Sequence, residues 1–421
     1  MAGVIWWIIR VSAMKPGPWT IIYGATVFIL VAVIGVSMVY TPEPMVVIYN
    51  DAMIEPSQNW NMYRLNITHL GLAPEDCVVG SGLVLEWRTE RLNHGEYAAS
   101  KSSPVVYRDT VFVGLDTGAL VAVDRESGEI EWSFYTRRSR NGIHGSPCVD
   151  PSRGLVYIGA YDGWIYAVDI DSGIKVWENR LGSYIGSSPT LYNDVVYIGV
   201  EMDKPDGYIV GVDADTGREV FRTDPLGDHP HSTPSVDPVS RCVFIGENDG
   251  DLYSYWLNGS MRWSYHTGSA IKSTPAILDG VVYITSWDRK LHAVNISTGE
   301  PLWVFTSGAS SMSSPTINPD NGLIYFGNHG GLIYAVNSTT GDDVWRYKTG
   351  DMITASPTLV QSTNTVIIGS KDKGVYLLDA MTGEVKQKLE LLSGFTGVPV
   401  AVGDHLYLFD HLGYLYSYRM G

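Results

Sequence analysis

The chain has 421 residues, of which 29 are Lys or Arg and 45 are Asp or Glu, so its formal net charge is −16. This acidic balance argues against nucleic acids and anionic membrane surfaces as partners. The three cysteines, Cys77, Cys148 and Cys242, are too few for a disulfide framework, so we expect buried free thiols.

Residues 19–41 form a run of 23 residues without a charge, which is long enough to cross a bilayer. Basic residues precede this run, whereas the first charged residues after it are acidic. The positive-inside bias places residues 1–18 in the cytoplasm as a short tail and the rest of the chain outside. We therefore expect a single-pass protein of the cell membrane, with one transmembrane helix at 19–41.

A cleaved signal peptide is the alternative interpretation of the same run. The run is long for a signal peptide and ends without a small-x-small cleavage site, which favours the transmembrane helix. No lipobox cysteine follows the run, so we do not expect a lipoprotein anchor. Residues 42–57 contain three prolines and are expected to be a stalk linker that leads to a domain at 58–421.

A short phrase of small, mostly hydroxylated residues followed by proline recurs along this domain. Successive prolines are 40 to 45 residues apart. A period near forty residues that carries strand signals is typical of a propeller or a solenoid. The prolines are Pro104, Pro147, Pro189, Pro234, Pro275, Pro315, Pro357 and Pro399.

Each repeat contains four strand signals, in which Tyr, Ile, Val and Phe alternate with small or polar residues. A turn of the form Asp/Asn-x-x-Ser/Thr-Gly recurs between the third and fourth strands, where Gly supplies a positive φ. A large side chain follows four residues after the glycine, as inter-blade packing requires. These side chains are Trp132, Trp177, Phe221, Trp263, Trp303 and Trp345, with Gln387 in the seventh repeat.

The eighth repeat has only three strand signals before the chain ends. Leu83–Thr89, which carries Trp87 and precedes the first repeat, supplies the missing strand. Pairing between the two ends of the domain leaves no open strand edge. The sequence therefore predicts an all-β fold, an eight-bladed β-propeller of four-stranded blades closed by its terminal strands.

The repeats resemble the pyrroloquinoline-quinone-type repeat, with its Ser-Pro, Val-Tyr-Ile-Gly and Ala-Val-Asp-x-x-Thr-Gly-x-x-x-Trp elements. The segment Trp60–Gly71 resembles the one that opens many such propellers. This repeat builds quinone-dependent dehydrogenases and also BamB-type propellers that perform no chemistry, so it implies a fold rather than an activity. The resemblance implies an extracytoplasmic module that binds or scaffolds proteins of the envelope or cell surface.

The residues three positions before the prolines are predicted to lie at one mouth of the channel. Four of these eight are Lys or His, a marked excess in an acidic chain, and they predict a site for an anionic ligand. Solvated loop residues are the alternative interpretation. The four residues are Lys101, His144, His231 and Lys272.

The quinone-dependent dehydrogenases offer an alternative function, a minimal oxidoreductase with pyrroloquinoline quinone over calcium. The resemblance implies a Glu and an Asn as calcium ligands, and Glu201, Asn248 and Arg289 lie near the corresponding motifs. Residues 266–272, where the family carries its catalytic base, contain no acid, and no long insertion roofs a cofactor. We therefore expect no cofactor and favour a binding protein over an enzyme.

Two further surface features concern partners and modification. The basic loop at 137–143, with Arg137, Arg138 and Arg140, is our predicted contact for a protein partner. No metal-ligand spacing is evident, and His229-Pro230-His231 is interpreted as a turn. Sequons, which would accept N-glycans in a competent organism, occur at Asn66, Asn258, Asn295 and Asn337.

Overall fold

The computed structural model describes residues 59–80, 82–94, 102–137, 142–204 and 206–421. The chain divides into two units, 1–50 and 51–421, and the first unit lies outside the described residues. The predicted tail, transmembrane helix and stalk lie outside them as well. Within the described ranges, no helix has the length and apolar character needed to cross a membrane.

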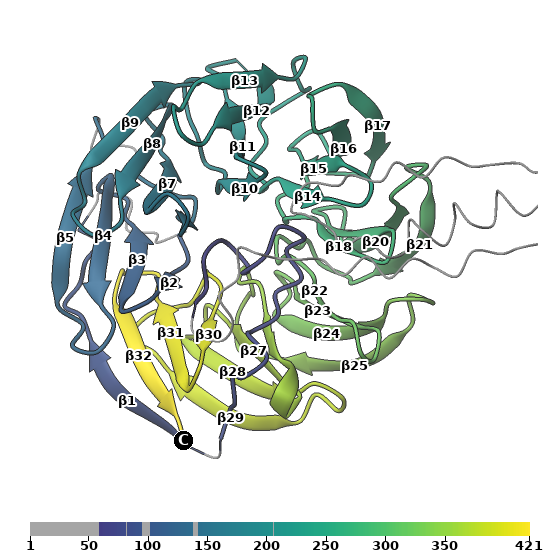
Figure 1. Ribbon diagram of the computed structural model, residues 1–421. Coiled ribbons are helices and arrows are strands. Elements are labelled where there is room, and N and C mark those ends of the chain that lie inside the picture. Colours follow the sequence, from purple (N-terminus) through teal and green to yellow (C-terminus); the bar gives the residue numbers. More distant parts are fainter. Residues whose placement is uncertain (1–58, 81, 95–101, 138–141, 205) are drawn as a thin grey trace, which may run out of the picture. The chain divides into compact units, whose positions relative to one another are not determined.

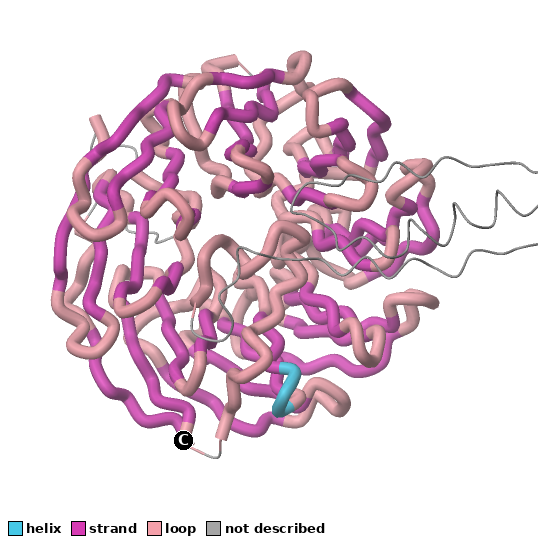
Figure 2. Tube along the Cα trace, viewed as in Figure 1, coloured by secondary structure: helices cyan, strands magenta, loops and turns pink. Residues whose placement is uncertain are grey.

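The described part of the second unit forms eight four-stranded antiparallel sheets that are arranged as blades around a common centre (Figure 1). Strands and loops make up almost all of it, and the one short helix drawn is the 3-10 turn η1 (Gln361–Thr363; Figure 2). The predicted eight-bladed β-propeller is therefore confirmed.

In the first seven blades the strands run from the centre of the ring outward in chain order, and the eighth blade ends with β1. The first blade comprises β2 (Val105–Tyr107), β3 (Thr110–Gly114), β4 (Ala119–Asp124) and β5 (Ile130–Tyr135). The second comprises β6 (Cys148–Asp150), β7 (Leu155–Gly159), β8 (Trp164–Asp169) and β9 (Lys175–Arg180). The third comprises β10 (Thr190–Tyr192), β11 (Val195–Glu201), β12 (Gly207–Asp213) and β13 (Glu219–Arg222). The fourth comprises β14 (Ser235–Asp237), β15 (Cys242–Gly246), β16 (Asp251–Trp256) and β17 (Met261–His266).

The second half of the ring repeats the same order. The fifth blade comprises β18 (Ala276–Leu278), β19 (Val281–Thr285), β20 (Lys290–Asn295) and β21 (Pro301–Thr306). The sixth comprises β22 (Thr316–Asn318), β23 (Leu323–Gly327), β24 (Leu332–Asn337) and β25 (Asp343–Lys348). The seventh comprises β26 (Thr358–Val360), β27 (Thr365–Gly369), β28 (Gly374–Asp379) and β29 (Val385–Glu390). The eighth comprises β30 (Val400–Val402), β31 (His405–Phe409), β32 (Leu415–Met420) and β1 (Leu83–Arg88).

The eighth blade joins the two ends of the domain, as the sequence predicts. Strand β1 pairs antiparallel with β32, with Leu83 opposite Met420 and Arg88 opposite Tyr416. The last blade thus gains its outer strand from the start of the domain. This closure locks the ring, because the blade cannot be completed until both ends have folded.

Recurrent tryptophans join six of the eight blades to the next. The indole Nε1 of Trp345 donates a hydrogen bond of 2.9 Å to the carbonyl of Ala380, in the hairpin turn of the following blade. Gly383 of that turn has φ +73°, and a Cβ there would lie 2.6 Å from the Trp345 ring. The turn glycine and the tryptophan are therefore two halves of one contact. Equivalent hydrogen bonds run from Trp87, Trp132, Trp177, Trp263 and Trp303.

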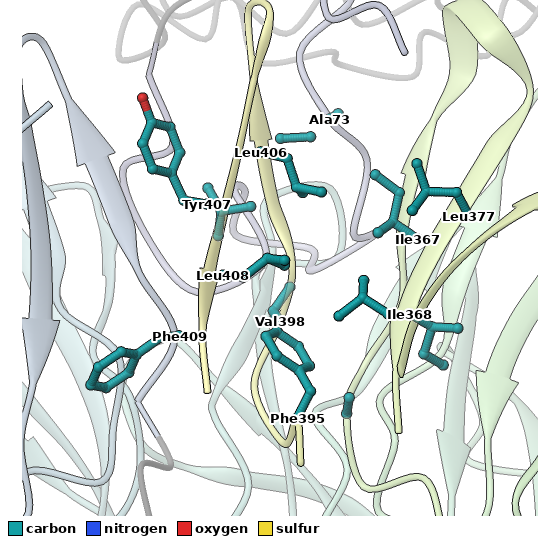
Figure 3. Packing of buried hydrophobic residues seen from close by; sticks show 14 of the residues in the cluster. Ala73, Ile367, Ile368, Leu377, Phe395, Val398, Leu406, Tyr407, Leu408 and Phe409 are labelled. Carbon is teal, nitrogen blue, oxygen red and sulfur yellow. The ribbon is translucent and has the colours of Figure 1, made fainter. Parts of the chain in front are cut away.

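Apolar side chains fill the space between neighbouring blades. Figure 3 shows this packing between the seventh and eighth blades, where Ile367 and Ile368 of β27 face Leu406 and Leu408 of β31. Ala73, from the segment before the first blade, packs into the same cluster. The three cysteines are buried and free, as expected.

A ring of hydrogen bonds links the residues that precede the repeat prolines. The backbone N–H of Ser146 donates to the hydroxyl of Ser188 at 2.9 Å, and Ser103 donates likewise to Ser146 at 2.8 Å. The pattern continues through Thr233, Thr274, Ser314 and Ser356. Val398 has no hydroxyl to accept from the seventh blade, but its own N–H donates to Ser103 at 2.9 Å. The blades are therefore tied together at the centre of the ring.

The segment 59–77, which we call the lead-in, lies across the inner ends of the blades near the centre of the ring (purple in Figure 1). Its backbone accepts the N–H of the middle residue of the innermost strand in six blades among the described residues. These donors are Val106, Val149, Val236, Ile277, Ile317 and Leu359. The lead-in thus satisfies backbone groups that would otherwise face the ring centre, and it covers one side of that centre.

Arg64 anchors the lead-in to the ring. Its side chain is fully buried and donates to the carbonyls of Ser314 at 3.0 Å and of Pro315 at 2.5 Å. It also donates to the carbonyl of His69 at 2.9 Å and to Thr316 Oγ1 at 2.8 Å. Burial lowers the pKa of the Arg64 guanidinium to about 10, so the side chain remains charged at neutral pH.

We expect Arg64→Met to lower the free energy of unfolding by at least about 3 kcal/mol, because four buried acceptors lose their donor. The lead-in should also become the first segment that a protease cleaves. Denaturant unfolding and limited proteolysis with mass spectrometry measure both effects. The control is Arg218→Met on an exposed turn. Equal stability of the two variants would contradict this role of Arg64.

Candidate functional site at the centre of the ring

A cavity of about 340 Å³ lies on the ring axis, and residues of all eight blades line it. Tyr63 of the lead-in also lines it, with its hydroxyl 3.5 Å from Ser314 Oγ and 3.4 Å from Ser356 Oγ. Most of the wall consists of two sets of residues. One set is the hydroxylated residues directly before the repeat prolines, and the other is the residues three positions before those prolines. The repeated phrase of the sequence therefore builds the cavity.

Three of the four cationic residues predicted for the channel mouth line this cavity. His144, His231 and Lys272 come together here from the second, fourth and fifth blades. The fourth, Lys101, lies outside the described residues.

Tyr161, Lys371 and His411 also line the cavity and were missed by the sequence analysis. Each lies two residues after the last residue of the second strand of its blade. These last residues are Gly159 of β7, Gly369 of β27 and Phe409 of β31. This position could have been found by aligning the repeats on that strand end. The chemical type of the residue varies from blade to blade, so composition alone gave no signal.

The cavity has a basic lining in an acidic chain. Among the described lining residues are two lysines and three histidines but no Asp or Glu. Lys272 Nζ lies 4.4 Å from the centre of the Trp287 ring, and Trp287 in turn contacts His329 at 6.0 Å between ring centres. Burial, and then the charges of Lys371 and Lys272, lower the pKa of His329. The two lysines therefore act on the same side of the cavity.

The opposite side of the cavity is aromatic with carboxylates behind it. The His144 ring lies 4.0 Å from the Tyr161 ring between centres, and its Nε2 is 3.7 Å from Asp116 Oδ1. Burial and the nearby carboxylate of Glu201 raise the pKa of the Tyr161 phenol, which stays protonated. This side can donate a phenolic hydrogen bond but carries no fixed positive charge of its own.

Glu201 ends β11 and is only 2% exposed. Its Oε1 lies 3.2 Å from His231 Nδ1 and its Oε2 lies 3.7 Å from His229 Nδ1. The absence of a side chain at Gly186 leaves room for this carboxylate, because a Cβ there would lie 2.9 Å from Glu201 Oε1. The 229–231 turn thus joins Glu201 in a cluster of the kind that can hold a metal ion, which the sequence spacing did not reveal.

The three residues predicted under the quinoprotein alternative do not come together as one site. The Asn248 N–H donates to the His229 carbonyl at 3.3 Å, which places Asn248 beside the Glu201 cluster. Arg289 instead lies in the turn before β20, where its φ is +74° and its carbonyl accepts a hydrogen bond from Ser307 Oγ. It is not among the lining residues of the cavity.

The residues present do not fit pyrroloquinoline quinone over calcium. Calcium prefers hard oxygen ligands, but two imidazole nitrogens lie within 4 Å of the Glu201 carboxylate, where such an ion would bind. His266, at the start of the loop that lacks an acid, is itself bonded to Asp251 at 2.8 Å. We derive no redox step for this site.

The basic loop and the sequons lie apart from the cavity lining. Arg137 forms an ion pair with Glu178, and its guanidinium lies 4.3 Å from the centre of the Trp164 ring. The positive charge of Arg137 is therefore already paired with a carboxylate of this chain. Arg138 and Arg140 lie outside the described residues. The sequon residue Asn66 lies on the lead-in, and the remaining three, Asn258, Asn295 and Asn337, lie at hairpin turns of outer strands.

Comparison with known proteins places this architecture in a family. The family described as "Outer membrane protein assembly factor BamB" matches residues 81–223 and 205–420. BamB of Moranella endobia is 26% identical over 204 residues, which cover 46% of this chain and 50% of that protein. The quinohemoprotein alcohol dehydrogenase ADH-IIG of Pseudomonas putida is 25% identical over 236 residues, which cover 48% of this chain and 32% of that enzyme.

Solved structures agree on the fold. BamB from Moraxella catarrhalis has a TM-score of 0.66 at 18% identity, with 80% of this chain and 100% of that chain covered. A europium-containing methanol dehydrogenase has a TM-score of 0.71 at 13% identity, with 88% and 100% covered. The chain spans about half the length of the BamB relatives it matches and less of the dehydrogenase. Because the family match extends over most of the propeller, the chain belongs to the family described as "Outer membrane protein assembly factor BamB".

Proposed function

We propose that this protein is a membrane-anchored, extracytoplasmic binding module for protein partners of the cell envelope, and that its axial cavity binds a carboxylate. The lining of the cavity is the observation that supports carboxylate binding. Its described residues include two lysines and three histidines but no Asp or Glu, in a chain of net charge −16. Relatives named as assembly factors of outer membrane proteins support envelope proteins as the partners.

The hydroxyl ring adds donors to this basic lining. The hydroxyl oxygens of Ser146 and Ser188 each accept a backbone N–H, so each hydroxyl retains its own hydrogen for donation. Both residues line the cavity. Charge-assisted hydrogen bonds to a carboxylate are stronger than neutral ones, and a concave site excludes competing water. The cavity thus offers both charge and donors to an anion.

The basic loop at 137–143 remains our proposed second contact for a protein partner, although Glu178 already pairs with Arg137. A minimal quinone-dependent oxidoreductase is the alternative function. Only the positions of Glu201 and Asn248 favour it, and the imidazoles beside Glu201 argue against its calcium ion. The binding module is therefore the function that the geometry supports best.

We expect the double variant Lys272→Ala/Lys371→Ala to bind succinate at least about tenfold more weakly than the unchanged protein at low salt, because two charges facing the cavity are lost. Isothermal titration calorimetry measures the affinity. The matched control, Lys175→Ala/Lys290→Ala, removes the same net charge from ion pairs outside the cavity lining. A triglutamate peptide in place of succinate shows whether a free anion or an acidic side chain is preferred.

Equal loss of affinity in both double variants would show that only net charge matters. Failure of the unchanged protein to bind either probe would overturn the carboxylate proposal. Proteins of unchanged thermal stability are compared, so that a folding defect is not mistaken for lost binding.

We expect Lys371→Ala and Lys272→Ala each to raise the pKa of His329. The pKa of this residue is lowered first by burial and then by the two lysines, so removal of a positive neighbour favours the imidazolium. NMR titration of protein labelled with 13C at histidine measures the shift, and Lys175→Ala is the control. An unchanged His329 pKa in both cavity variants would mean that the lysine charges do not act across this side of the cavity.

We expect the full-length protein to stay in the membrane pellet after alkaline carbonate extraction, because residues 19–41 are proposed to span the bilayer. A variant without residues 1–41 should move to the soluble fraction. Immunoblotting of the fractions and the mass of the mature protein are the measurements. A soluble full-length product shortened near residue 41 would instead support the cleaved signal peptide.

A further inference from the structure

We propose that Glu201, His229 and His231 form a binding site for a divalent transition metal ion of the zinc class. Their ligand atoms all lie within 4.8 Å of one another, which is close enough for one ion to bind all three. Two imidazoles and one carboxylate, with a further position left open, are a donor set of known metal centres. The inference concerns a site separate from the lysines, and its test requires no anionic ligand.

The hydrogen bonds of His229 leave the correct nitrogen available to a metal. Its Nε2 lies 2.9 Å from the carbonyl of Met202 and 3.0 Å from that of Lys204, so Nε2 carries the hydrogen in the neutral ring. The lone pair is then on Nδ1, which faces Glu201 Oε2 at 3.7 Å. Backbone carbonyls that accept the second N–H of a histidine are a common outer shell of metal sites.

Glu201 lacks sufficient compensation for its burial. Its Oε1 is buried and accepts no hydrogen bond, and its described ion pairs are those with His229 and His231. A buried carboxylate is costly unless a positive charge or donors compensate it. A metal ion between the carboxylate and the two imidazoles supplies that charge while the imidazoles stay neutral.

The two histidines belong to a loop whose backbone is held in place. The Asp228 N–H donates to Glu247 Oε1 at 2.9 Å, and the His229 carbonyl accepts from Asn248 at 3.3 Å. Pro230 restricts the backbone between the two ligands. A Cβ at Gly207 would lie 2.2 Å from this proline ring, so the neighbouring strand approaches closely. Ligands fixed in this way lose little entropy when a metal binds.

The donor set selects among metals, and the position of His231 shows where the open site faces. Imidazole nitrogen suits zinc, cobalt and nickel, whereas calcium and magnesium prefer oxygen. His231 lines the axial cavity, and Gly186 beside the Glu201 carboxylate lines it too. The fourth coordination position therefore faces the cavity.

The test uses full-length protein purified without a histidine tag and treated with a chelator. We expect one equivalent of Co²⁺ to give the visible absorption bands of a tetrahedral or five-coordinate site, and Zn²⁺ to abolish them. Zn²⁺ should also raise the melting temperature, because it binds the folded state. Millimolar Ca²⁺ should do neither.

Glu201→Gln and His229→Ala/His231→Ala should lose stoichiometric Co²⁺ binding and the Zn²⁺-dependent rise in melting temperature. His266→Ala removes an exposed imidazole that is paired with Asp251, and it should bind like the unchanged protein. Gly186→Ala tests the geometry without removing a ligand, because its Cβ displaces the Glu201 carboxylate, and it should weaken Co²⁺ binding at least about tenfold.

Circular dichroism identifies any variant that fails to fold. If a ligand variant does not fold, Co²⁺ binding by Gly186→Ala is the test of the site instead. Co²⁺ spectra that persist in Glu201→Gln would overturn the site. The proposal also fails if the unchanged protein gives no Co²⁺ bands.

Discussion

The hydrogen bond from the residue before a repeat proline to the hydroxyl of the next blade, formed at seven of the eight blade junctions, is the constraint on which the centre of this molecule depends. Proline holds its predecessor in an extended conformation, so that residue's N–H points sideways, toward the neighbouring blade. The acceptor must be short to fit near the axis, and only Ser or Thr offers a hydroxyl on Cβ. Ser146 and Ser188, 2.9 Å apart in this bond, illustrate the rule. The same hydroxyls then form the wall of the cavity.

The lead-in forms part of the wall of that cavity. Its backbone takes up the N–H groups of innermost strands from Val106 to Leu359, and Arg64 fixes it through four hydrogen bonds. Tyr63 of the lead-in lines the cavity as a result. His144, His231 and Lys272 line it as well, together with hydroxylated residues that directly precede the repeat prolines.

Much of the fold could be predicted because it repeats. Eight blades, closure by Leu83–Arg88 and one ring contact per blade follow from a period near forty residues. Lysines and histidines at one phase of the repeat were found for the same reason. Lys371, His411 and the contacts of Glu201 with His229 and His231 were not, since each appears once and does not recur with the repeat. The unit that holds Glu201, His229 and His231 departs from the repeat, with 45 residues between Pro189 and Pro234, the longest such spacing. Two longer loops of that unit, which carry Met202 and His229, are distant in sequence but in contact in the structure. The sequence therefore shows that this unit is longer than the others, but it does not show that the two loops touch.

The two proposed sites border the same cavity from different sides, and their charges are opposed. Glu201 contributes a negative charge behind Gly186, while Lys272 and Lys371 contribute positive charges on later blades. A divalent metal on Glu201 reverses the sign of the first wall and makes the whole cavity attractive to an anion. A carboxylate that then occupies the open metal position gains a bond in addition to the lysine contacts. By linkage, the anion strengthens metal binding by the same factor as the metal strengthens anion binding. Metal binding at Glu201 and anion binding in the cavity would therefore reinforce each other.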